Sequence, residues 1–228
     1  MAKDIYTQHP IMEFLSRLFD ILILNFFTLL TSIPVITIPA AASSMYYVML
    51  KIIRDEDSGT VKLFFRFFAD NFLKSLPYAL VIVPVQGILY LALFSMAYGN
   101  EGGPVAFGLS LGVLAIVTVL SVWSLLLFAQ FDNSFGRTVI NAVKLTVFNP
   151  LRSLAILAAN GLMAVLLLFA PAVFIYFLAL WIFMGAGIIG FISAKTAVPV
   201  FDELMPEREE IPDPLEEELE DDEEESGE

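Results

Sequence analysis

Long apolar stretches without charge alternate with short charged segments along the chain. Four stretches contain no Asp, Glu, Lys or Arg: residues 21–50, 75–100, 102–131 and 153–194. A helix needs about 20 apolar residues to cross the roughly 30 Å hydrocarbon core of a bilayer. Each of the first three stretches is long enough for a crossing, and the fourth is long enough for two. The pattern predicts an all-α fold, a polytopic membrane helix bundle with five or six membrane helices.

The first stretch is too long for one straight crossing, since its 30 residues would form a helix of about 45 Å. Pro34 and Pro39 each remove a backbone N–H and disfavour helix at the residue before them, so we expect a structural break here. The break separates a helix over residues 11–33 from a second helix over about residues 40–54. If both helices cross the membrane, the bundle has six spans; if they form one broken span, it has five. We favour six.

Turn-forming residues indicate the remaining corners. Residues 99–104 (Gly-Asn-Glu-Gly-Gly-Pro) predict a turn, and Pro171 divides the last apolar stretch into helices over residues 153–169 and 172–194. Residues 202–228 contain 16 acidic residues and one basic residue, a composition typical of disorder. The expected organisation is an N-terminal segment (1–10), a transmembrane helix bundle (11–200) and an acidic, disordered tail (201–228).

An internal repeat precedes two of the spans. Residues 60–76 recur as residues 138–154, with the same Thr-Val start and a shared N-x-L-[K/R]-S-L end. In the first copy Lys62, Arg66 and Asp70 form one polar stripe on a helix otherwise rich in Phe. We predict two amphipathic helices, one in each copy. Such a helix suits the headgroup region of a bilayer, and it suits equally an elbow packed between spans.

The distribution of charge predicts the orientation of the chain. The net charge of −13 comes from the tail, because the rest of the chain holds 11 basic and 9 acidic residues. Residues 51–74 contain five Lys and Arg and residues 132–152 contain three, whereas the turn at 99–104 and the corner at Pro171 contain none. By the positive-inside rule, both repeat copies and the tail are cytoplasmic. Nothing in this distribution suggests nucleic-acid binding.

Residues suited to catalysis or metal binding are scarce. The chain has one histidine, His9, and no cysteine, so we expect no catalytic triad, no metal site, no cofactor and no enzyme activity. The apolar stretches carry none of the ionisable residues that ion-coupled carriers generally keep as relays. We expect the small-residue patterns in the spans to serve close helix packing; they are Gly108-x-x-x-Gly112 and the cluster Gly185, Gly187 and Gly190.

The repeat is the most specific feature of the sequence. Its cations and aromatic residues could dock a partner on the cytoplasmic face, or they could anchor the chain to the lipid bilayer. The candidate docking residues are Phe64, Arg66, Phe67, Asn71, Lys74, Lys144, Asn149 and Arg152.

Residues 25–56, N-F-F-T-L-L-T-S-I-P-V-I-T-I-P-A-A-A-S-S-M-Y-Y-V-M-L-K-I-I-R-D-E, resemble the YesL-like family, a bacterial integral-membrane family of unknown function. The stretches F-F-R-F-F-A-D-N-F (64–72) and F-D-N-S-F (131–135) are also similar to it, and the similarity covers residues 13 to about 197. The resemblance implies a multi-pass protein of the cell membrane of Gram-positive bacteria, linked to carbohydrate uptake and often found beside ABC-type sugar importers. It implies no catalytic residues.

Two functions from different classes follow. The first is an accessory protein that binds the membrane subunits of a sugar ABC importer. The alternative is an independent small-solute permease or channel. The uncharged spans and the paired cationic segments favour the first.

Overall fold

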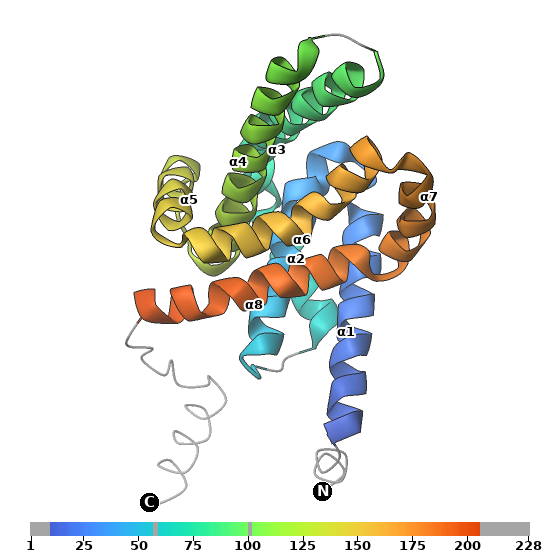
Figure 1. The fold of residues 1–228 in the computed structure, drawn as a ribbon. Coiled ribbons are helices and arrows are strands. Elements are labelled where there is room, and N and C mark those ends of the chain that lie inside the picture. Colours follow the sequence, from blue (N-terminus) through green and yellow to red (C-terminus); the bar gives the residue numbers. More distant parts are fainter. Residues whose placement is uncertain (1–9, 57–58, 100–101, 206–228) are drawn as a thin grey trace, which may run out of the picture. The chain divides into compact units, whose positions relative to one another are not determined.

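The computed structural model describes residues 10–56, 59–99 and 102–205. All regular elements in this part of the chain are helical (Figure 1), as predicted. In chain order they are α1 (Pro10–Thr31), the 3-10 helix η1 (Val35–Thr37), α2 (Ile38–Ile53), α3 (Thr60–Tyr98), α4 (Gly103–Gln130), α5 (Phe135–Phe148), α6 (Pro150–Phe169), α7 (Pro171–Leu180), the π-helix η2 (Trp181–Gly185) and α8 (Ala186–Leu204).

Residue contacts divide the chain into two units, Met1–Ala197 and Val198–Glu228. Of the second unit the structure describes residues 198–205, which contain the end of α8. The predicted N-terminal segment, apart from Pro10, and the predicted acidic tail from residue 206 onward lie outside the described residues.

The predicted break in the first apolar stretch is confirmed between α1 and α2. Pro34 has extended backbone angles (φ −74°, ψ 116°), and the Thr37 hydroxyl lies within hydrogen-bond distance of the carbonyl oxygens of Pro34 (2.5 Å) and Thr31. Pro39, by contrast, lies in the first turn of α2, where a helix needs no backbone N–H from it. Pro34 therefore breaks the chain, whereas Pro39 helps to begin the next helix.

Helices α1 and α2 pack side by side and antiparallel (Figure 1). Near the start of α1, the guanidinium of Arg17 lies 2.6 Å from the carboxylate of Asp55, which follows α2. This arrangement corresponds to two separate helices and not to one broken span. Among the described residues, the segments long and apolar enough to cross a membrane are Val35–Ile53, Thr60–Tyr98, Gly103–Gln130, Pro150–Phe169 and Pro171–Leu204, so five candidate spans are present without α1.

The two repeat copies have different structures. The first copy is the beginning of α3, which continues without interruption for 39 residues through Pro77 and Pro84. The second copy is divided: α5 ends at Phe148, Asn149 leaves the helical region (φ −124°, ψ 62°), and α6 begins at Pro150. Pro150 corresponds to Phe72 in the first copy, and a proline disfavours helical angles at the residue before it. Pro150 is therefore one difference between the copies that favours the break at Asn149.

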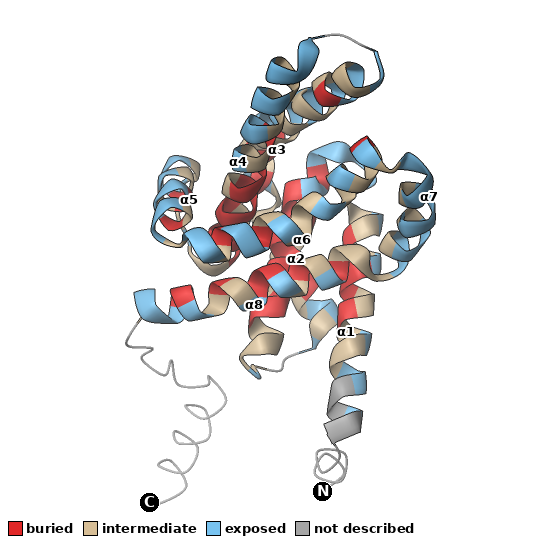
Figure 2. Ribbon diagram, viewed as in Figure 1, coloured by how far each residue is buried: buried red, intermediate tan, exposed pale blue. Residues whose placement is uncertain are grey.

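Buried residues concentrate on α2, on the second half of α4 and on one side of α8 as far as Ala197, with fewer on α1 and α3, whereas α7 has no buried residue (Figure 2). Trp123 of α4 is fully buried, and its indole N–H donates to the hydroxyl of Ser153 on α6 (3.0 Å). Leu93, Leu114 and Leu168 form a second cluster, near which the Tyr98 hydroxyl lies 3.0 Å from the carbonyl oxygen of Leu167. These contacts connect α3, α4 and α6.

The glycine patterns serve packing in one case and not in the other. A Cβ at position 187 would lie 2.7 Å from the carbonyl oxygen of Ile21, and a Cβ at position 190 would lie 2.5 Å from the terminal methyl of Met45. Gly187 and Gly190 therefore let α8 approach α1 and α2 closely. Apart from adjacent residues and the nearby backbone of α4 itself, no atom of the described residues lies within 4 Å of a Cβ placed at Gly108 or Gly112. The expectation that Gly108 and Gly112 serve close helix packing is therefore wrong for the described helices.

Candidate functional site

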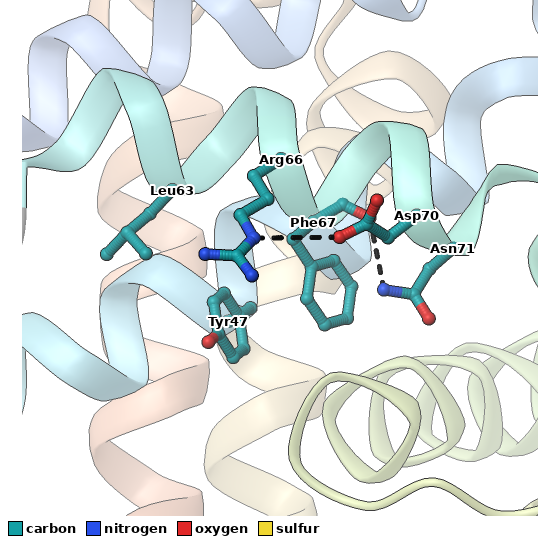
Figure 3. A pocket seen from close by; sticks show the side chains of 6 residues that line it. All are labelled: Tyr47, Leu63, Arg66, Phe67, Asp70 and Asn71. Atoms are coloured by element: carbon teal, nitrogen blue, oxygen red, sulfur yellow. Dashed lines mark hydrogen bonds and ion pairs between the residues drawn. The ribbon is translucent and has the colours of Figure 1, made fainter. Parts of the chain in front are cut away.

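A hollow of about 290 Å³ lies between α2 and the first turns of α3. Its lining consists of Tyr47, Leu63, Arg66, Phe67, Asp70 and Asn71, and we call it the α3 hollow. Figure 3 shows the five α3 side chains along one side of the helix, with Tyr47 of α2 beside Arg66 and Phe67. The spacing of these residues in the sequence explains the arrangement, since positions three, four, seven and eight apart share one face of a helix.

An aromatic stack forms the floor of the α3 hollow. The rings of Tyr47 and Phe67 are stacked with centroids 4.4 Å apart, and Phe67 meets Phe128 of α4 edge to face at 6.3 Å. On the other side, the ammonium of Lys51 lies 5.5 Å from the centre of the Tyr47 ring. Each aromatic pair contributes about 0.5–1.5 kcal/mol beyond its buried area. The packing of α2 and α4 therefore holds Phe67 in place.

Polar groups form the rim. The guanidinium of Arg66 lies 3.8 Å from the carboxylate of Asp70, and both side chains are largely exposed. The amide of Asn71 donates to the carbonyl oxygen of Phe67, one turn earlier (3.1 Å). An exposed ion pair of this kind contributes only about 0–1 kcal/mol, so a ligand or partner could separate it at little cost. The α3 hollow thus combines an exposed arginine, Arg66, with an aromatic ring, Phe67, that its stack with Tyr47 holds in place.

The predicted docking residues fall into separate groups. Arg66, Phe67 and Asn71 lie together in the α3 hollow. Phe64, by contrast, has no exposed surface and packs against the rings of Phe27, Phe65 and Phe68. Phe64 therefore belongs to the hydrophobic core and does not line the α3 hollow.

The remaining predicted docking residues do not line the α3 hollow. Lys74 is paired with Asp132, which follows α4 (2.9 Å). Lys144 is exposed on α5. Arg152 at the start of α6 donates to the side-chain oxygen of Asn149 (3.3 Å). The second copy therefore adds no residue to the hollow formed by the first.

Sequence reasoning missed Tyr47, Leu63 and Asp70 as lining residues. Leu63 and Asp70 could have been found, because they lie on the same helical face as Arg66 and Phe67. Tyr47 could not, since its contact with Phe67 depends on how α2 packs against α3.

Charged side chains from several elements gather at the end of the bundle that carries the α3 hollow. Arg54 at the end of α2 donates to the side-chain oxygen of Gln130 at the end of α4 (2.7 Å). Lys51 pairs with Glu56 (3.1 Å), and Thr60 donates to the carboxylate of Asp20 on α1 (2.7 Å). These contacts place the first repeat copy, the start of α1 and the α4–α5 connection at one end, as the charge pattern predicts.

Two asparagines inside the spans form hydrogen bonds to other helices. The amide of Asn25 donates to the carbonyl oxygen of Ile182 (2.8 Å) and accepts from the backbone N–H of Gly187 (2.9 Å). Asn160 donates to the hydroxyl of Ser193 (3.1 Å). Within the described residues, no group of three or more His, Cys, Asp and Glu side chains could hold a metal ion. His9 lies outside the described residues. Asn25 and Asn160 thus connect helices, whereas the hydroxyls of Thr31, Ser43, Ser44 and Ser121 bond to the backbone of their own helices.

A family model described as "Protein of unknown function, DUF624" matches residues 21–93. The match extends from α1 through most of α3 and includes every residue that lines the α3 hollow. No curated protein and no solved structure matches the chain. The chain is a multi-pass helical membrane protein, and the matching family carries no assigned function.

Proposed function

We propose that the protein is an accessory subunit of the bacterial cell membrane that binds a membrane subunit of an ABC-type sugar importer through the α3 hollow. The observation that carries this proposal is the pairing of an exposed arginine with an aromatic ring already fixed by its neighbours. Arginine and aromatic residues dominate the binding energy of protein interfaces. Because the stack with Tyr47 holds Phe67 in place, little side-chain entropy is lost when a partner binds.

The position of the α3 hollow agrees with such a role. It lies at the charged end of the bundle, which the distribution of Lys and Arg assigns to the cytoplasm. There it would meet the cytoplasmic loops of a neighbouring membrane protein. The resemblance to the YesL-like family supplies the link to carbohydrate uptake, and the proposal assigns no catalysis and no cofactor.

The test is co-purification from membranes in mild detergent. Arg66→Ala with Phe67→Ala removes the two groups that a partner would contact, and we expect the importer's membrane subunits to be lost from the purified sample. Lys62→Ala with Phe65→Ala is the matched control, because it removes one cation and one aromatic ring from the same helix outside the α3 hollow. The control should retain the partner.

Two outcomes contradict the proposal. If the Arg66 and Phe67 double variant retains the importer subunits while both proteins are present at normal levels, the α3 hollow is not the docking site. If no importer subunit accompanies the unmodified protein, the alternative of an independent small-solute permease or channel takes precedence. Uptake of candidate solutes into proteoliposomes containing the protein alone would then be measured.

A further inference from the structure

Helix α5 is held at the point where two candidate spans leave the membrane. Four residues connect it to the end of α4, and Asn149 alone connects it to α6. Both α4 and α6 are long and apolar enough to cross a bilayer. Connections this short cannot carry α5 away from the membrane surface, since an extended chain spans at most about 3.6 Å per residue.

One side of α5 packs against the bundle. Thr138, Ala142 and Leu145 are buried, and they repeat at intervals of three and four residues, which places them on one helical face. This face accounts for the contact between α5 and α4.

The opposite side of α5 is not covered by any other described helix and is strongly apolar. Ile140, Val147 and Phe148 are 58%, 66% and 79% exposed, and Val143 is 44% exposed. The exposed apolar surface continues into the first turn of α6, where Leu151 is 82% exposed. Water would be an unfavourable neighbour for a surface of this size and continuity.

Two cations lie within this exposed surface, between Ile140 and Phe148 around the helix. Arg137 and Lys144 are exposed and seven residues apart, so they lie nearly in line along the helix. No carboxylate of the described residues pairs with either of them. Arg17, Lys51, Arg66 and Lys74, by contrast, each have a carboxylate within 4.0 Å. The exposed side of α5 therefore has a positive charge that no described residue neutralises.

We propose that α5 is an interfacial helix that lies in the headgroup region of an anionic lipid leaflet, with Ile140, Val143, Val147 and Phe148 toward the acyl chains and Arg137 and Lys144 on lipid phosphates. A helix with an apolar face beside Lys and Arg is the form that binds to anionic membrane surfaces. The proposal goes beyond the docking function. It assigns different tasks to the two repeat copies: the first builds the α3 hollow, and the second contacts lipid.

A depth measurement tests the apolar half of the proposal. The chain has no cysteine, so a nitroxide label can be placed singly at Val147→Cys in the full-length protein, in nanodiscs of phosphatidylcholine and phosphatidylglycerol. Ile175→Cys on α7 serves as the lipid reference and Ser58→Cys as the aqueous reference. We expect the Val147 label to collide with oxygen more than the Ser58 label does, and with a water-soluble nickel chelate less.

A second measurement tests the cations. Arg137→Gln with Lys144→Gln should reduce the preference of the purified protein for phosphatidylglycerol over phosphatidylcholine, measured by native mass spectrometry of bound lipids. The expected loss is up to about fivefold per cation, which corresponds to about 1 kcal/mol for each Lys or Arg near an anionic surface. Lys62→Gln with Arg66→Gln changes the net charge equally in the first copy and should leave most of the preference intact.

Three results would overturn the proposal. A Val147 label as accessible to the nickel chelate as the Ser58 label would place the exposed side of α5 in water. A label shielded from both reagents in native membranes, but not in nanodiscs, would indicate a protein partner. Equal losses of lipid preference in the two double variants would show that overall charge, and not α5, attracts the lipid.

Discussion

At Asn25 a side-chain amide is inserted into the backbone hydrogen bonds of another helix. The Asn25 amide bonds to the carbonyl of Ile182 and to the N–H of Gly187. These two backbone groups are five residues apart, which is the spacing of a hydrogen bond in a π-helix. The π-helix η2 therefore coincides with the point where α1 supplies a substitute partner. Unpaired backbone groups are costly inside a membrane, so this side chain stabilises an otherwise unfavourable turn.

We predict that Asn25→Leu lowers the free energy of unfolding in detergent by about 1–3 kcal/mol, because it leaves the carbonyl of Ile182 and the buried N–H of Gly187 without their partner. Thermal unfolding of the purified protein measures the effect. Gln86→Leu is the matched control, because it makes the same kind of change in α3, where the Gln86 side chain has no hydrogen-bond partner among the described residues, and it should leave the melting temperature unchanged. An unaltered melting temperature for Asn25→Leu would show that the carbonyl of Ile182 and the N–H of Gly187 find other partners when Asn25 is absent.

The glycines provide a second prediction at the residue scale. Gly187→Ala should destabilise the protein by about 1–3 kcal/mol, because the new methyl group meets the backbone oxygen of Ile21. Gly190→Ala should cost less, since the atom it meets is the flexible end of Met45.

Gly108→Ala and Gly112→Ala are the matched controls, measured by the same thermal unfolding. Both positions have open space around them, and alanine is favoured over glycine in a helix by about 0.5–1 kcal/mol. These variants should therefore be neutral or slightly more stable. Destabilisation at Gly108 or Gly112 would indicate that this face of α4 is covered by another molecule.

At the scale of elements, the two repeat copies differ in structure where Pro150 replaces Phe72. Phe72 lies inside α3, and its counterpart Pro150 begins α6 after the break at Asn149. The break gives α5 a direction different from that of α6, whereas the first copy and the span that follows it belong to one uninterrupted helix, α3. The same sequence pattern thus forms a long helix in one half of the chain and a separate surface helix in the other.

We predict that Phe72→Pro destabilises the protein by about 3 kcal/mol or more, because proline inside a helix removes a backbone hydrogen bond and clashes with the preceding turn. Phe72→Ala separates this effect from the loss of the ring, which packs 5.9 Å from Phe68, and should cost clearly less. Unfolding in detergent compares the two. Equal effects would mean that α3 is already broken in solution, as the second copy is.

At the scale of the whole molecule, ion pairs and hydrogen bonds tie the charged segments of Met1–Ala197 together. Arg17 with Asp55 and Thr60 with Asp20 join α1 to the α2–α3 connection, and Lys74 with Asp132 joins the first repeat copy to the α4–α5 connection. Such contacts require these segments to lie on one side of the membrane.

We predict that single cysteines at Ser58 and Ser134 are protected from an impermeant thiol reagent in intact cells, while a cysteine at Asn100 is labelled. The concentration of cations near residues 58 and 134 favours the cytoplasmic side for both. A cysteine at Thr7 should behave like that at Ser58, since Arg17 in the N-terminal half of α1 pairs with Asp55 in the α2–α3 connection. Permeabilised cells provide the control for reactivity. Labelling of Ser58 and Ser134 from outside would reverse the topology, and labelling of Thr7 alone would contradict the pairing of Arg17 with Asp55.

The sequence by itself determined the all-helical membrane class, the break at Pro34, the turn after Tyr98 and the corner at Pro171. These features depend on local properties, namely the length of an uncharged stretch and the restricted backbone of proline and glycine, which act wherever the residue occurs. The shared side of the charged segments also followed from sequence, because two spans between the repeats return the chain to the same face.

Only the tertiary structure decided which residues of the first repeat copy are buried and which are exposed. Its phenylalanines occur on nearly every side of the helix, so no periodicity separates the buried Phe64 from Phe67 on the α3 hollow. The contact of Asn25 with η2 joins residues 157 positions apart, and the stack of Tyr47 on Phe67 joins two helices. Contacts of this kind depend on the relative positions of helices, because in a membrane apolar side chains gain little by preferring one helical neighbour to lipid, and the few polar groups and small residues select the packing.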